Sequence, residues 1–194
     1  MNHRSTKVVT DLLLIEGYTD NPDAVMFDHW LPRRVVYRED NQLLRAYLPI
    51  SDPNLGAERL DELKAMVTSR APSLRDVNVS RLGQILDWPG SSIGELPRHH
   101  YVVEIDPEAG FEDELADYYD SEQIPSFAAV QGTIRAQRFI NHDRGPRWLT
   151  CFDLAFDNIV DSPDWNGVLD TAWSEEMEVH LRNTSQMLYQ VVDV

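Results

Sequence analysis

Apolar and polar positions along the chain follow two periods, one typical of β-strands and one typical of α-helices. In the first half, apolar runs rich in β-branched residues predict strands at residues 8–15, 35–38, 43–48 and 77–88. Asn21 and Pro22 predict the start of a helix that ends at Pro32. A second helix is predicted over residues 57–70, where one stripe contains Leu60, Leu63, Lys64 and Val67. The predicted order is strand, helix, strand, strand, helix, strand.

The second half repeats this order. Strands are predicted at residues 101–105, 133–140, 147–154 and 186–192. One helical region follows Pro107, and a second covers residues 165–182. Pro32 and Pro125 each end the first helix of their half, and residues 89–97, rich in Gly, Ser and Pro, form the linker. We therefore predict an α+β protein of two fused ferredoxin-like βαββαβ units, residues 1–96 and 97–194.

The composition is typical of a folded, soluble protein and argues against several partners. Of 194 residues, 42% are hydrophobic, and 17 Lys and Arg against 33 Asp and Glu give a net charge of −16. Such an acidic surface repels nucleic acids and anionic lipids, so we expect neither a nucleic-acid nor a membrane partner. The first apolar stretch is interrupted by Asp11 and is too short for a signal peptide or membrane span. A single cysteine, Cys151, fits a reducing compartment, which predicts a cytoplasmic protein.

Motifs for cofactors are absent from the sequence. The six histidines show no ligand spacing typical of a metal site, and no glycine-rich loop joins a strand to a helix. Cys151 lies among apolar residues and is predicted to be a buried, unreactive thiol. We therefore expect no metal and no organic cofactor.

A family resemblance is carried by the second half of the chain. Its main segment is Tyr118-Tyr119-Asp120-Ser121-Glu122-Gln123-Ile124-Pro125, followed by Ala136-Gln137-Arg138-Phe139 and Gly145-Pro146-Arg147-Trp148-Leu149. These residues resemble the dimeric α+β barrel superfamily, in particular its EthD-like branch. The first half matches in element order and in its His-x-x-Pro, as a degenerate repeat. The resemblance implies two four-stranded antiparallel sheets packed face to face, with helices outside and a hydrophobic pocket inside.

The resemblance also bears on the site residues. The family commonly has a histidine beside the glutamate, where this chain has Gln123, which can hydrogen-bond but cannot exchange a proton near neutral pH. His29, in the matching stretch of the first half, is a candidate to replace it. Arg138 matches an arginine that could clamp a carboxylate or enolate; the alternative is a salt bridge to Glu122 or Asp120.

Alternation along the strand at residues 100–106 places His100 and Glu104 on the face toward the barrel interior. At ~3.3 Å per residue they lie roughly 13 Å apart and could flank a substrate. Alternatively, His100 is a rim residue and Glu104 a surface carboxylate at the strand end. Together with His29 these two are the predicted catalytic residues, and the predicted substrate-binding residues are Gln123, Arg138, Trp148 and Tyr118.

Three functional hypotheses follow. The first is an enzyme that acts on a small hydrophobic or aromatic acid by general acid/base chemistry, through isomerisation, cyclisation or dehydration. The second is a noncatalytic protein that binds a hydrophobic ligand in the same barrel. The third is a cofactor-free monooxygenase, which needs a substrate that forms a stabilised carbanion. The sequence leaves open whether the barrel closes within one chain or in a homodimer.

Overall fold

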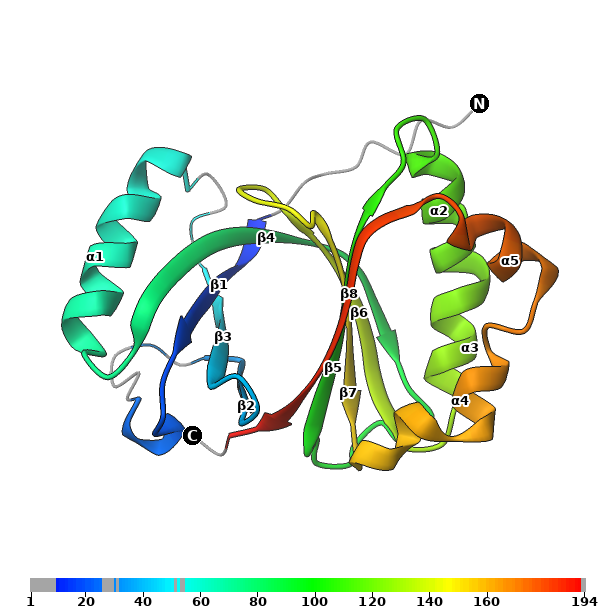
Figure 1. Ribbon diagram of the computed structural model, residues 1–194, viewed down its shortest axis with the longest axis horizontal. Coiled ribbons are helices and arrows are strands. Elements are labelled where there is room, and N and C mark those ends of the chain that lie inside the picture. The colour runs from blue at the N-terminus through cyan, green and yellow to red at the C-terminus, as the bar shows by residue number, and fades with distance from the viewer. Residues whose placement is uncertain (1–9, 26–29, 31, 51, 53–54, 193–194) are drawn as a thin grey trace.

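A computed structural model describes residues 10–25, 30, 32–50, 52 and 55–192. In this part of the chain eight strands form a closed barrel in the order β1-β3-β2-β8-β5-β7-β6-β4, and every pair of neighbours is antiparallel (Figure 1). The strands are β1 (Thr10–Tyr18), β2 (Arg34–Arg38), β3 (Leu43–Pro49), β4 (Arg75–Pro89), β5 (His99–Pro107), β6 (Thr133–Asn141), β7 (Trp148–Leu154) and β8 (Leu181–Val191).

Both halves of the chain contribute four neighbouring strands to this barrel. Within each half the strands lie in the same order, fourth, first, third and second, which is that of a ferredoxin-like unit. Two further pairings close the barrel, β4 with β6 over a long stretch and β2 with β8 through Val36 and Tyr37. The predicted fold class is therefore confirmed, and the barrel closes within one chain.

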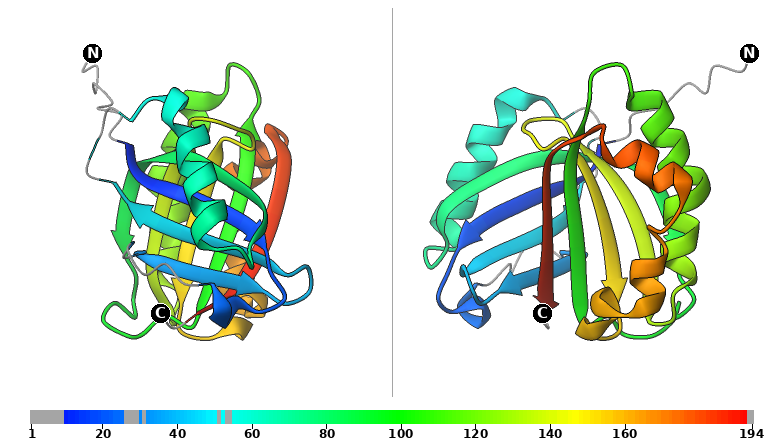
Figure 2. Two further views of the ribbon diagram at one scale, coloured as in Figure 1. Left: turned by 90° about the vertical axis from the view of Figure 1, so that its left-hand side faces the viewer. Right: turned by 45° about the vertical axis from the view of Figure 1, so that its right-hand side comes forward.

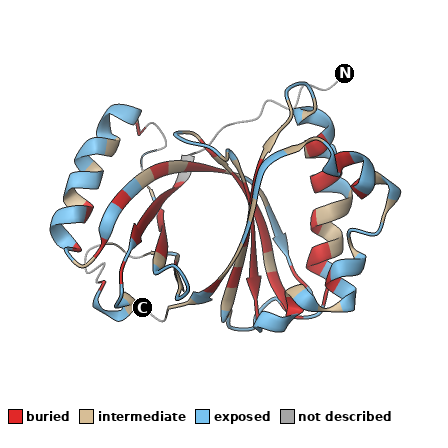
Figure 3. Ribbon diagram, viewed as in Figure 1, coloured by how far each residue is buried: buried red, intermediate tan, exposed pale blue. Residues whose placement is uncertain are grey.

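Helices cover the outer faces of the barrel on two sides (Figures 1 and 2). On the first half, α1 (Leu60–Arg70) packs Leu60, Leu63 and Val67 against the sheet, and three of the four residues of the predicted stripe thus serve this contact. On the second half the cover consists of α2 (Glu112–Tyr118), α3 (Ile124–Ala129), α4 (Pro163–Gly167) and α5 (Ala172–Glu178). The strands and the inward faces of these helices hold most buried residues (Figure 3).

A third apolar cluster fills the middle of the barrel. It consists of inward side chains from all eight strands, namely Leu12, Leu14, Val36, Tyr47, Leu82, Val102, Phe139, Leu149, Cys151 and Tyr189. Cys151 is buried, as predicted for an unreactive thiol, and burial raises the pKa of its thiol to about 12. The interior is thus a packed core, and polar side chains gather at its two ends.

Two predicted helices differ from the structure. After Asn21 the described residues contain only a 3-10 turn, Pro22–Ala24, while residues 26–29 and 31 lie outside the described part. The helix predicted over residues 165–182 is divided into α4 and α5, because the Thr171 hydroxyl accepts a hydrogen bond from the Ser174 backbone N–H and begins a new helix. The strand β8 then begins at Leu181, five residues before the predicted start.

Short turns complete the described secondary structure. They are 3-10 turns at Ala57–Arg59 and Asp157–Asp161 and a π-helical turn at Tyr119–Gln123. Gly132, which precedes β6, has a φ of 93°, a conformation that favours glycine. None of the described helices is long and apolar enough to cross a bilayer.

Candidate functional site

The strand β5 places His100 and Glu104 at opposite ends of the barrel interior, as alternation predicts. Both side chains are buried, with relative exposures of 3% and 8%. Val102, which lies between them on the same face, belongs to the apolar cluster in the middle of the barrel. The two predicted catalytic residues therefore belong to two separate polar clusters.

The His100 cluster consists of His100, Asp153, Arg34, Tyr47 and Gln137. The His100 Nδ1 lies 2.8 Å from Asp153 Oδ1, and the other carboxylate oxygen accepts a hydrogen bond of 2.6 Å from Arg34 Nη2. The His100 Nε2 lies 3.3 Å from the Tyr47 hydroxyl. The β5–β7 register sets this geometry, because it places His100 directly opposite Asp153. A carboxylate at Nδ1 and a polar group at Nε2 are the surroundings of a histidine that transfers protons.

Ionisation in this cluster follows from burial and from charge. Burial raises the pKa of Asp153, but the hydrogen bond from His100 and the charge of Arg34 outweigh it, so the pKa lies below its ordinary value. Burial holds the pKa of Tyr47 well above its ordinary value. Asp153 is therefore a stable anion at neutral pH, and Tyr47 is a neutral hydroxyl that can donate a hydrogen bond.

A small cavity of about 20 Å³ adjoins the His100 cluster and is lined by His100, Asp153, Tyr47 and Gln137, among others. The Gln137 side chain is 6% exposed, and its Nε2 has no hydrogen-bond partner among the described residues. Leu12 and Arg33 line this cavity and also an open depression of about 400 Å³. The lining of the depression combines the apolar residues Leu12, Pro49, Ile85 and Leu86 with the polar residues Arg33, Gln84 and Asp87. The reactive atom of a substrate could enter the cavity while its apolar part lies outside.

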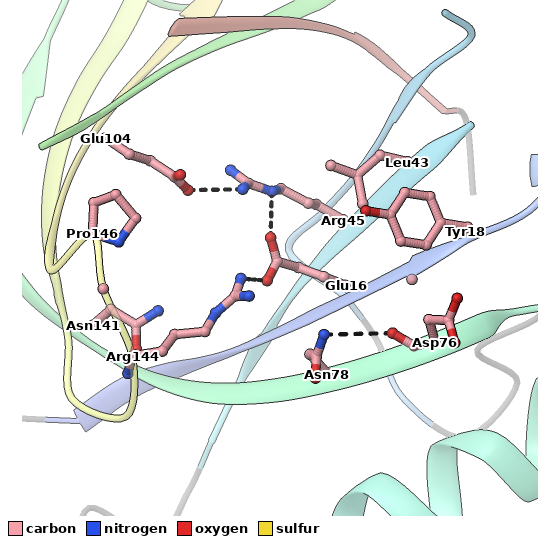
Figure 4. Close-up of a pocket in the computed structure, with 12 residues that line it drawn as sticks. Glu16, Tyr18, Leu43, Arg45, Asp76, Asn78, Glu104, Asn141, Arg144 and Pro146 are labelled. Carbon is pink, nitrogen blue, oxygen red and sulfur yellow. Dashed lines mark hydrogen bonds and ion pairs between the residues drawn. The ribbon is translucent and has the colours of Figure 1, made fainter. Parts of the chain in front are cut away.

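The Arg45 cluster occupies the other end of the barrel and consists of Glu16, Arg45, Glu104 and Arg144 (Figure 4). Arg45 Nε lies 2.8 Å from Glu16 Oε1, and Arg45 Nη2 lies 2.7 Å from Glu104 Oε1. Arg144, from the loop between β6 and β7, pairs with the other oxygen of Glu16. Positive and negative groups thus alternate along the row Glu104, Arg45, Glu16, Arg144. All four line a cavity of about 210 Å³.

Arg45 is the buried centre of this row. Burial acts to lower the pKa of its guanidinium, but Tyr47, Tyr189 and Glu104 raise it above its ordinary value, so the group stays charged. The guanidinium carbon lies 5.3 Å from the ring centroid of Tyr189, a cation–π distance. Arg45 Nη1 has no hydrogen-bond partner among the described residues.

The predicted substrate-binding residues lie on the other face of the same sheet, under the helices. Arg138 lies between two aromatic rings, 4.6 Å from the centroid of Tyr119 and 4.8 Å from that of Trp148. It forms an ion pair with Asp120, and the structure thus contains the salt bridge that was the alternative to an anion clamp. The π-helical turn carries both Tyr119 and Asp120. These contacts hold the helices of the second half on their sheet.

Tyr118 and Gln123 are also separated from the barrel interior. Tyr118 is buried, and its hydroxyl contacts the Ser174 hydroxyl. Hydrogen bonding by Gln123 acts to lower the pKa of both Tyr118 and Tyr119, although burial raises both. His29 lies outside the described residues. The structure therefore does not bring the predicted residues into one site: His100 and Glu104 face the interior, and the other four described residues lie on the outer face.

Several residues of the two interior clusters were not singled out from the sequence. They are Glu16, Arg34, Arg45, Tyr47, Gln137 and Asp153. A signal was present, because Glu16 and Arg45 are charged residues inside otherwise apolar strand runs, at positions where alternation points inward. Within the described residues no group of His, Cys, Asp and Glu could hold a metal ion.

Comparison with known proteins gives relatives in structure but none in sequence. No family model matches the chain, and no curated protein matches it. A Fusobacterium nucleatum protein with a provisional monooxygenase name has a TM-score of 0.61 and 10% identity, covering 97% of this chain and 94% of that one. An anthrone oxidase-like protein has a TM-score of 0.59 and 11% identity, covering 95% of this chain and 92% of that one.

A third similar structure comes from Listeria monocytogenes and is described as a ferredoxin-fold protein related to antibiotic biosynthesis monooxygenases. It has a TM-score of 0.59 and 7% identity, and the alignment covers 98% of this chain and all of the other. At such low identities the likeness concerns the fold. The chain therefore has the ferredoxin-like α+β barrel fold, shared over nearly its whole length with proteins named after monooxygenases.

Proposed function

We propose that the protein is a small-molecule enzyme in which His100 transfers a proton to and from a hydrophobic or aromatic acid. The observation that carries this proposal is the buried pair of His100 and Asp153, whose second histidine nitrogen lies beside a small cavity. The chemistry that this pair supplies is general acid/base catalysis, as in an isomerisation, cyclisation or dehydration. It requires no metal or organic cofactor.

The geometry assigns a role to each member of the His100 cluster. Asp153 accepts the Nδ1 proton of His100, so the lone pair lies on Nε2. That lone pair accepts from the Tyr47 hydroxyl and can take a proton from substrate carbon once the hydroxyl turns to the substrate. The Tyr47 hydroxyl lies beside that nitrogen, and Gln137 Nε2 is an unused donor at the same cavity. Either donor can stabilise the oxyanion that forms when a proton is removed next to a carbonyl group. His100 then returns the proton to another atom of the substrate.

The depression outside the cavity suits an acid with an apolar body. Arg33, which lines both hollows, lies 3.9 Å from Asp87, whereas Asp87 lies 2.8 Å from Arg135. Because Asp87 has this closer partner, the Arg33 guanidinium can turn to a substrate carboxylate at little cost. Leu12, Ile85 and Leu86 then offer an apolar wall to the rest of the molecule.

A second candidate function is a cofactor-free monooxygenase, which the names of two structural neighbours favour. His100 would again remove the proton, and the resulting carbanion would react with dioxygen. A substrate CH₂ group becomes a carbonyl, one oxygen atom enters the product, and the other leaves as water. The first step is shared, so only the fate of the carbanion distinguishes the two candidates.

The test is proton–deuterium exchange in D₂O, followed by NMR over a panel of arylacetic and other hydrophobic acids. The wild type is expected to catalyse exchange at carbon, and His100→Gln to lose at least about a hundredfold of that rate. His99→Gln is the matched control, because His99 precedes His100 on β5 and its side chain points to the opposite face of the sheet.

The outcomes separate the hypotheses. Oxygen consumption with a 1:1 yield of carbonyl product assigns the monooxygenase. Tight binding of an acid with no exchange and no oxygen uptake supports the noncatalytic ligand-binding protein. Equal rates in His100→Gln and His99→Gln would exclude His100 as the base.

The EthD-like branch, the homodimer, the cytoplasmic location and a catalytic role for His29 or Glu104 stay predictions.

A further inference from the structure

We propose that the cavity at the Arg45 end of the barrel is a second ligand site, which binds a small carboxylate between Arg45 and Arg144. The cavity has a volume of about 210 Å³ and is bordered by all four members of the Arg45 cluster. The site lies at the end of the barrel opposite His100, and it stands independently of the proposed catalytic function.

The first argument is a buried donor without a partner. Arg45 is 3% exposed, and it uses Nε for Glu16 and Nη2 for Glu104. Its Nη1 has no hydrogen-bond partner among the described residues, although Arg45 lines the cavity. A buried cationic donor that lacks an acceptor is unfavourable. The cavity therefore favours a ligand that brings an acceptor oxygen to this nitrogen.

The second argument concerns charge. Three carboxylates and two guanidinium groups line the cavity, so the net charge of its lining does not by itself attract an anion. Both buried carboxylates are already paired with guanidinium groups, however. Glu104 binds Arg45 and Ser185, and Glu16 binds Arg45 and Arg144. Asp76, the third carboxylate, is exposed, and solvent screens its charge.

Arg144 supplies a second donor at the mouth of the cavity. Its side chain is 39% exposed and lies on the loop between β6 and β7, and burial lowers the pKa of its guanidinium. Glu16 retains Arg45 as a partner when Arg144 turns away. A carboxylate that enters the cavity can thus accept from Arg45 with one oxygen and from Arg144 with the other. The planar guanidinium groups suit this two-oxygen acceptor.

The size of the cavity limits the ligand. A volume of 210 Å³ corresponds to about seven water molecules at liquid density, which suits acids from acetate to benzoate. Leu43 and Pro146 also line the cavity and provide apolar contacts for a short chain or a single ring. Larger polycyclic acids do not fit.

The apolar middle of the barrel separates this site from His100. Leu14, Leu82 and Val102 belong to the cluster that fills this layer. Leu43 lines the Arg45 cavity, whereas Leu12 lines the hollows at the His100 end. Their methyl groups therefore report separately on the two ends.

The experiment is a benzoate titration of the full chain with ¹³C-labelled leucine methyl groups, followed by NMR. Benzoate is expected to shift the Leu43 methyl signals with a Kd of about 1 mM or tighter. Arg144→Gln is expected to weaken this binding at least about tenfold. The matched control is Arg147→Gln, on the same exposed loop but outside the cavity lining, which is expected to bind as the wild type does.

Several results would overturn the proposal. Benzamide or benzylamine binding as tightly as benzoate would show that the site does not select a carboxylate. Shifts confined to the Leu12 methyl groups would place the acid at the His100 end instead. Equal weakening by Arg144→Gln and Arg147→Gln, or no Leu43 shift at about 10 mM benzoate, would exclude the assigned donors. The methyl spectrum of each variant without benzoate shows whether it is folded.

Discussion

Buried charged groups are paired differently at the two ends of the barrel. At the His100 end one carboxylate, Asp153, is held by a histidine and by Arg34, whose side chain is 21% exposed. At the Arg45 end a single arginine with 4% of its side chain exposed holds two carboxylates. The first arrangement contains an imidazole, which can act as an acid or a base, whereas the second contains only carboxylates and guanidinium groups. One end is thus suited to proton transfer and the other to binding.

Arg45→Met gives the sharpest test of this contrast. The substitution leaves Glu16 and Glu104 buried without their common cation, and we expect the free energy of unfolding to fall by about 3–5 kcal/mol. Arg34→Met is expected to reduce it by only about 1–2 kcal/mol, because Asp153 keeps its bond to His100. Urea unfolding of both variants measures the difference.

The triple variant Glu16→Gln, Arg45→Met, Glu104→Gln is the control, since it removes the charges together. It is expected to recover much of the loss, because uncharged side chains need no buried counterion. If Arg45→Met lowered stability no more than Arg34→Met does, the Arg45 cluster would not depend on one shared cation.

Asp153→Asn tests the His100 end and is expected to lower stability by about 1–3 kcal/mol at neutral pH. The pKa of Asp153 is lowered in the folded protein, so its carboxylate contributes stability above its ordinary pKa of 3.8 and loses that contribution as the pH falls through the lower folded value. Stability of the wild type should therefore decline more steeply than that of Asp153→Asn below about pH 4. Parallel curves for the two proteins would contradict the assigned ion pairs.

Arg144→Gln should have a smaller effect on stability, below about 1 kcal/mol, because its side chain is partly exposed and Glu16 retains Arg45. The difference from the wild type should shrink further in salt. Urea unfolding at low and high ionic strength measures both effects. A loss as large as that of Arg45→Met would mean that Arg144 is part of the buried core of the cluster.

Labelling of Cys151 by a thiol reagent tests whether the apolar layer between the two ends of the barrel stays closed. We expect no labelling. Burial raises the pKa of this thiol to about 12, and the side chain lies in the apolar middle of the barrel. A thiol reagent should therefore not label Cys151 in the folded wild type. Adding benzoate should not make the thiol reactive. Rapid labelling in the absence of denaturant would show that the middle layer opens and that the ends communicate.

The sequence predicts the strands well because apolar alternation is a local property. The predicted strand at residues 133–140 corresponds to Thr133–Asn141, and the one at 147–154 to Trp148–Leu154. Alternation along β5 likewise predicts that His100 and Glu104 face the interior. The predicted helix bounds are less accurate, because the cap at Thr171 divides a segment that the apolar period alone predicts to be one continuous helix.

The partners of the interior residues could not be predicted, because they depend on the register between strands distant in the sequence. His100 and Asp153 are 53 positions apart, and the β5–β7 pairing alone brings them opposite each other. Glu104 and Arg45 lie on strands that are not even neighbours in the barrel. The position of Arg138 was ambiguous for another reason, since neither face of its strand is clearly polar and both a clamp and a salt bridge suit an arginine there.

Closure of the barrel within one chain frees it from symmetry. β1 and β5 hold equivalent places in the two halves, as do β3 and β7. The side chains on these strand pairs nevertheless differ. Glu16 lies opposite Arg45 on β1 and β3, whereas His100 lies opposite Asp153 on β5 and β7. A barrel of two identical chains must carry each of these groups twice. The fused chain carries the His100–Asp153 pair once, so the two ends of its barrel can differ in chemistry.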